Sequence, residues 1–145
     1  FASYGVTPIG GGWSVAPAVL AQSSKDRYVK GDSYEWVTLN TRLIKEVTQN
    51  FALAFEGSYQ YMDLNPEGYK DRNAVNGSFY KLTFAPTLKA SKIGDFFSRP
   101  ELRLFATWMD WSSKLDHYAS DDAFGSSGFN AGGEWNFGVQ METWF

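Results

Sequence analysis

Residues 135–145 read Trp-Asn-Phe-Gly-Val-Gln-Met-Glu-Thr-Trp-Phe, and this stretch decides the fold. Every second residue, counted back from the last, is apolar or aromatic except for one threonine: Phe145, Thr143, Met141, Val139, Phe137 and Trp135. The residues between them are mostly polar: Trp144, Glu142, Gln140, Gly138 and Asn136. Because side chains alternate between the two faces of a β-strand, the pattern predicts a strand with one apolar face and one polar, solvated face.

An alternating strand that ends on an aromatic residue is typical of outer-membrane β-barrels, whose apolar face meets lipid while the interior holds water. The same alternation recurs in six earlier segments, at about residues 2–7, 13–22, 34–45, 51–62, 79–89 and 100–111. Each later segment has about ten residues, the length of a tilted strand that crosses the hydrocarbon. A soluble β-sandwich also alternates, but its strands are usually shorter and its apolar faces less aromatic. We therefore expect an all-β, antiparallel transmembrane β-barrel.

Composition excludes several classes of protein. The 145 residues are 18% aromatic and 20% charged, with a net charge of −3 and no cysteine. No basic stripe indicates a nucleic-acid partner, and neither a disulfide scaffold nor a cysteine metal site is possible. No apolar run reaches the roughly 18 residues of a membrane helix.

The remaining chemical motifs are weak. His117 is the only histidine and has no evident partners for a zinc site or a catalytic triad. Asp121 and Asp122 do not have the spacing of a calcium-binding loop. The glycines at 10–12 are not followed by the Lys-Ser/Thr of a phosphate-binding loop. Residues 76–78, Asn-Gly-Ser, suggest a turn. We expect no enzyme activity, cofactor or metal.

The connections alternate in length. Those at 7–12, 46–50 and 90–99 are short, and those at 23–33, 63–78 and 112–134 are longer and polar. Barrels of this type have short periplasmic turns and long extracellular loops, which sets the expected orientation. Seven strands is an odd number and would leave free edges in lipid. We therefore expect residues 1–145 to be the carboxyl-terminal segment of one larger barrel domain, closed by other strands.

Two stretches resemble the carbohydrate-specific porins, the family of maltoporin, the sucrose porin and the β-glucoside porin. Residues 96–111, Phe-Phe-Ser-Arg-Pro-Glu-Leu-Arg-Leu-Phe-Ala-Thr-Trp-Met-Asp-Trp, resemble the penultimate strand of that family. Residues 137–145 are similar to its ending. The resemblance implies an 18-stranded barrel, a homotrimer and passive sugar diffusion across the bacterial outer membrane.

The resemblance also implies site residues. Trp144 and Phe97 fall at positions of the aromatic slide on which sugar rings stack, and Trp144 shares the polar face of Gln140 and Glu142. Alternatively, Trp144 is an interfacial girdle aromatic and Phe97 a turn residue. The expected pore-lining polar residues are Arg42, Glu56, Lys81, Arg103 and Glu142, which either contact sugar or pair and hydrate the interior.

Two other functions are open. The last strand, with Gly138, Met141 and Phe145, resembles the signal by which the barrel assembly machinery recognises its clients, so the chain could act as a folding substrate. A soluble sugar-binding sandwich is the third possibility.

Overall fold

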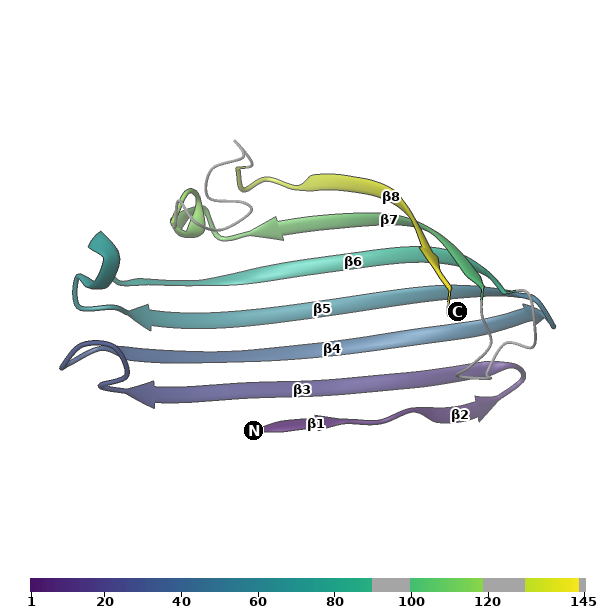
Figure 1. Cartoon of the computed structure of the whole chain (residues 1–145), viewed down its shortest axis with the longest axis horizontal. Coiled ribbons are helices and arrows are strands. Elements are labelled where there is room, and N and C mark those ends of the chain that lie inside the picture. Colours follow the sequence, from purple (N-terminus) through teal and green to yellow (C-terminus); the bar gives the residue numbers. More distant parts are fainter. Residues whose placement is uncertain (90–99, 119–129, 144–145) are drawn as a thin grey trace.

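The chain forms one curved antiparallel sheet in a computed structural model that describes residues 1–89, 100–118 and 130–143 (Figure 1). Its strands are β1 (Ala2–Tyr4), β2 (Thr7–Gly10), β3 (Trp13–Lys25), β4 (Ser33–Thr48), β5 (Phe51–Asn65), β6 (Val75–Lys89), β7 (Glu101–Trp111) and β8 (Glu134–Glu142). Two short 3-10 turns follow β5 and β7: η1 (Tyr69–Asp71) and η2 (Ser113–Leu115). No helix in the described ranges is long and apolar enough to span a bilayer.

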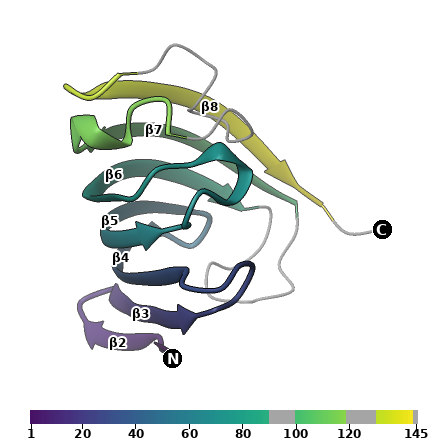
Figure 2. The same ribbon diagram turned by 90° about the vertical axis from the view of Figure 1, so that its left-hand side faces the viewer.

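The strands pair in the order β1-β3-β4-β5-β6-β7-β8, and β2 pairs with β3 beside β1. Every pair is antiparallel, as expected from sequence. Seen end-on, the strands follow an arc from β2 to β8 (Figure 2). Within the described residues this arc does not close, because β1 and β2 form one edge and β8 forms the other.

Two local predictions are wrong. The first strand does not end at Pro8, which lies inside β2 opposite Ser14. Proline is tolerated there because β2 lies at the edge of the described sheet. Residues 76–78 are not a turn but part of β6. A Cβ on Gly77 would lie 3.0 Å from the Ser112 Cβ and 3.1 Å from Leu115, so glycine makes room for the segment after β7.

The cross-strand register sorts the side chains onto two faces. One row of directly opposed residues crosses β4 to β8 as Leu43, Phe55, Phe84, Ala106 and Phe137. The neighbouring row on the opposite face is Arg42, Glu56, Thr83, Thr107 and Asn136. We call these the apolar face and the polar face of the sheet.

No protein layer covers the apolar face within the described residues. Phe84 is 41% exposed, Leu104 51% and Phe137 71%, although each is a residue that a globular core would bury. The buried large or aliphatic apolar residues of the described strands are few, and all lie on the polar face: Ala52, Ala85, Met109 and Trp111. The sandwich alternative is therefore wrong, because a sandwich packs its apolar faces together.

In the described residues the long loops lie at one end of the sheet and the short turns at the other, as predicted; the connection at 90–99 and residues 119–129 of the last long loop lie outside the described residues. At the long-loop end the Asp32 carboxylate accepts backbone N–H bonds from Arg27 at 2.6 Å, Tyr28 at 2.8 Å and Val29 at 3.1 Å. The Tyr28 ring stacks on Tyr69, with centroids 5.0 Å apart and planes 2° apart. These contacts order the loop at 26–32 and join it to the next long loop.

The Asp32 carboxyl makes the loop at 26–32 sensitive to acid. Burial acts to raise its pKa, but the three N–H bonds outweigh burial and lower the pKa below the ordinary 3.8. The stabilisation is therefore complete above pH 3.8 and is lost as the pH falls through the lowered pKa. Hydrogen exchange should show protected amides at 27–29 near neutral pH and lost protection in strong acid. Asp32→Asn should lower this protection at pH 7; an unchanged Asp32→Asn profile would contradict the prediction.

Adjacent residues on β4 test the assignment of the two faces. Leu39 is on the apolar face and Asn40 on the polar face. In a lipid bilayer, Leu39→Lys should lower the free energy of unfolding by about 2 kcal/mol, because it places a charge against hydrocarbon. Asn40→Lys is the matched control and should change it little. Urea titration of the protein folded in lipid vesicles measures both, and equal effects would refute the assignment.

Candidate functional site

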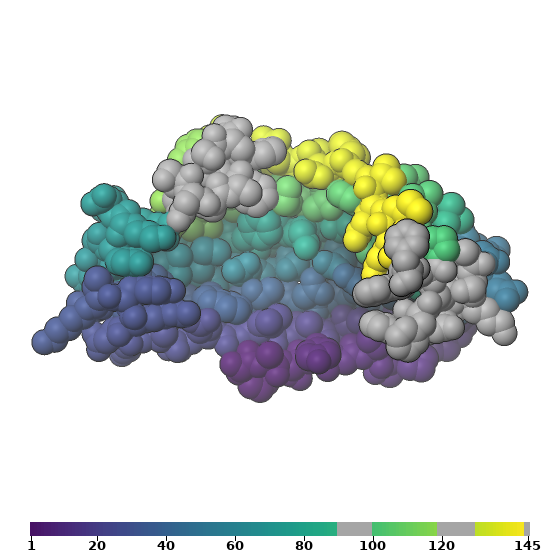
Figure 3. All heavy atoms as spheres, viewed as in Figure 1, coloured from purple at the N-terminus to yellow at the C-terminus, as the bar shows by residue number. Residues whose placement is uncertain are grey.

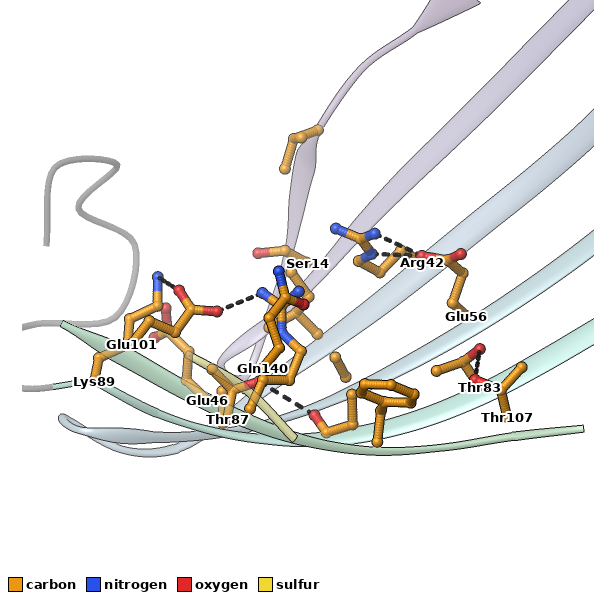
Figure 4. Close-up of a pocket in the computed structure, with 17 residues that line it drawn as sticks. Ser14, Arg42, Glu46, Glu56, Thr83, Thr87, Lys89, Glu101, Thr107 and Gln140 are labelled. Carbon is orange, nitrogen blue, oxygen red and sulfur yellow. Dashed lines mark hydrogen bonds and ion pairs between the residues drawn. The ribbon is translucent and has the colours of Figure 1, made fainter. Parts of the chain in front are cut away.

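The polar face is the concave side of the sheet, and it contains the candidate site. In space-filling view the middle strands are recessed between the β1–β2 edge and the β8 edge (Figure 3). A hollow of about 390 Å³ lies near the short-turn end, lined from β3 to β8 by polar-face residues (Figure 4). The polar lining residues are Ser14, Arg42, Glu46, Glu56, Thr83, Thr87, Lys89, Glu101, Arg103, Thr107 and Gln140.

Glu56 is held between two cations from the neighbouring strands. Arg42 on β4 lies directly opposite Glu56 on β5 and donates to its Oε2 through Nε at 2.8 Å and Nη2 at 2.6 Å. On the other side, the Lys81 Nζ on β6 lies 3.2 Å from Glu56 Oε1. Cross-strand neighbours of opposite charge stabilise a sheet, so this cluster, the Glu56 triad, ties three strands together.

A second cluster repeats the arrangement at the short-turn end. Glu101, the first residue of β7, lies opposite Lys89, the last residue of β6, and their Oε2 and Nζ atoms are 3.3 Å apart. Arg103 forms an ion pair with the other carboxylate oxygen. The Glu101 side chain is only 5% exposed. We call this cluster the Glu101 triad.

Neutral hydroxyl side chains lie beside the two triads, in the same cross-strand rows. Thr83 and Thr107 lie opposite each other and share a hydrogen bond of 2.9 Å between their hydroxyls. The Thr87 hydroxyl donates to the Ala85 carbonyl at 3.3 Å. Among the described lining residues three cations, Arg42, Lys89 and Arg103, face three carboxylates, Glu46, Glu56 and Glu101. Their charges cancel, so the hollow has hydrogen-bonding groups without a net charge.

The structure places the predicted pore-lining residues on one surface. Arg42, Glu56, Lys81 and Arg103 all lie on the polar face, and each takes part in one of the triads. Glu142, the last residue of β8, is on the same face opposite Glu101. Their contact with sugar stays a prediction.

Only some of the predicted sugar-slide and assembly-signal residues lie in the described part of the chain. Phe97, Trp144 and Phe145 lie outside the described residues. Gly138 and Met141 both belong to β8 but face opposite ways: Met141 is 66% exposed on the apolar face, and Gly138 faces Phe105 on the polar face.

Sequence reasoning missed several members of the site, among them Glu101 and Phe105. Glu101 was not a candidate because only the register shows that it meets Lys89 across two strands. Phe105 was missed although alternation from Arg103 places it on the polar face.

Removing the Glu101 charge tests whether the triad is a structural unit. Glu101→Gln leaves Lys89 and Arg103 close together without their shared anion. The free energy of unfolding should fall by about 1–3 kcal/mol, between the values for exposed and for buried ion pairs. Glu35→Gln, on an exposed side chain of the apolar face, is the control. The double variant Lys89→Met/Glu101→Met should recover part of the loss, and a loss no larger than that of Glu35→Gln would contradict the prediction.

The comparison with known families agrees with this geometry. The family model described as LamB porin matches residues 1–145, the whole chain. This match confirms the resemblance to the carbohydrate-specific porins. LamB porins are sugar-passing channels of the outer membrane and are not a family of enzymes. An open antiparallel sheet whose apolar face is uncovered in the described residues and whose concave face is polar is what a section of such a channel wall requires. The chain belongs to the LamB porin family.

Proposed function

We propose that this chain forms part of the wall of a channel through which uncharged sugars diffuse passively across the bacterial outer membrane. The observation that supports it most is the hollow on the polar face. Glu56 and Glu101 are each paired with cations, and the formal charges of the described lining sum to zero, so the surface offers hydrogen-bonding partners for hydroxyls without a large net charge. This suits a sugar channel, because a neutral solute has no net charge for an unbalanced field to attract, whereas such a field would favour ions.

The chemistry of the lining suits polyols. Carboxylates accept hydrogen bonds, arginine and lysine donate them, and threonine and glutamine do both. A sugar hydroxyl can also do both and can exchange one partner for the next along the wall. Conduction requires binding that is favourable enough for entry and weak enough for release, and a succession of such similar sites provides it.

The slide aromatics implied by the resemblance would extend this path. Phe97 follows β6, which ends at Lys89, and Trp144 follows β8, which ends at Glu142. Both positions thus come after strands that end beside the Glu101 triad. Stacking of sugar C–H faces on Trp144 and Phe97 there is part of the proposal.

Channel formation also requires closure. The outer edges of β1, β2 and β8 carry unpaired backbone groups within the described sheet, and such edges are very costly in hydrocarbon. We propose that further strands pair with both edges to complete a barrel, that the long-loop end faces outward, and that the barrels associate as homotrimers.

Single-channel recording tests the function. Ion current through the assembled porin in a planar bilayer should fall by more than half as a linear oligosaccharide is added, with a saturating dependence on concentration, because bound sugar obstructs the lumen. A polyethylene glycol of the same size is the control and should reduce the current without saturation. A channel that no sugar blocks beyond this control would refute the proposal.

A further inference from the structure

Phe105 is the one aromatic residue in the described lining of the hollow. It lies opposite Gly138 on β8. A Cβ built on Gly138 would lie 2.3 Å from the Phe105 Cζ, 2.8 Å from Cε1 and 3.1 Å from Cε2. The far end of the ring therefore occupies the space that any other side chain at position 138 would fill.

This contact fixes how the ring lies. Opposed residues of an antiparallel pair have Cβ atoms only about 4.5–5.5 Å apart. A phenylalanine ring that stood upright on β7 would carry its tip away from the sheet and from β8. With its tip against Gly138, the Phe105 ring instead lies along the sheet. One side of the ring covers the backbone of β8, and the other is turned toward the hollow.

Polar side chains frame the ring at both ends. Toward the short turns Arg103 lies opposite Gln140, and toward the long loops Thr107 lies opposite Asn136. The four residues are the next ones on the polar face, two positions before and after Phe105 and Gly138. An apolar plate between hydrogen-bonding groups matches a pyranose, which has a C–H face and hydroxyls around its rim.

A purely structural role would explain part of this arrangement. An aromatic ring laid over a glycine of the neighbouring strand shields the exposed backbone and stabilises the pair. That role needs bulk over Gly138, which leucine also supplies. It needs neither an aromatic surface nor the polar frame, so the two roles can be separated by substitution.

We propose that Phe105, seated on Gly138, is a stacking platform for a pyranose ring, with Arg103 and Gln140 bonding its hydroxyls. This site rests on the proposed function and adds a sugar contact between the two ion triads. The hollow of about 390 Å³ is within the size range of small-molecule sites.

Phe105→Leu and Phe105→Tyr in the assembled channel test the proposal. Phe105→Leu keeps apolar cover over Gly138 but removes the aromatic face. The oligosaccharide concentration that halves the current should rise roughly 2- to 10-fold, the equivalent of one aromatic stacking contact. Phe105→Tyr keeps the ring and should stay near the parent value. Phe84→Leu, which removes a ring from the apolar face, is the matched control and should not change the block.

Gly138→Ala is a second test of the Phe105 platform, made from the neighbouring strand. The added methyl group would displace the ring without removing it, so sugar block should weaken as in Phe105→Leu. The double variant Phe105→Leu/Gly138→Ala should be no weaker in sugar block than Phe105→Leu alone, because both changes act on one contact. A parent channel that sugar does not block would overturn both the proposed function and this site. A parent that is blocked, with unchanged block in Phe105→Leu or in a folded Gly138→Ala variant, would overturn the platform alone.

Discussion

The alternation of side chains along each strand is the constraint on which the structure depends. It gives one sheet two surfaces that require different surroundings. Phe55, Phe84 and Leu104 are 39–51% exposed, and no second layer of the described chain covers them. In water such a surface would drive aggregation, whereas in hydrocarbon it has almost no cost. The bilayer thus takes the place of the hydrophobic core, and backbone pairing becomes the main internal source of cohesion.

Because the sheet lacks a core, its polar face contributes to stability as well as to function. The triads centred on Glu56 and Glu101 each connect neighbouring strands through one carboxylate and two cations. Pairing offsets part of the penalty of confining charges in a partly buried wall, and with Glu46 included the formal charges of the lining sum to zero. The same contacts therefore tie neighbouring strands together and place hydrogen-bond donors and acceptors on the polar face.

Most of the fold could be predicted from sequence, because apolar and polar residues alternate along each strand and this pattern can be read from one strand at a time. The face of Arg42, Glu56, Lys81 and Arg103 follows from counting along each strand. Alternation does not reveal register, and so neither the Lys89–Glu101 pair nor the position of Phe105 over Gly138 could be assigned. Strand limits failed where tertiary contacts decide them: Gly77 reads as a turn residue in isolation but lies in β6, under Leu115. The sugar-slide roles of Phe97 and Trp144 stay predictions.

Two physically different explanations account for the presence of glycine at position 138. As part of an assembly signal it would matter for recognition before folding, together with Met141 and Phe145, and that role stays a prediction. In the folded sheet, glycine leaves free the space that the tip of the Phe105 ring fills. The second explanation links the last strand to the hollow. Since β8 carries both Gly138 and Gln140, the strand that forms one edge of the described sheet also completes the surface on which a sugar would rest.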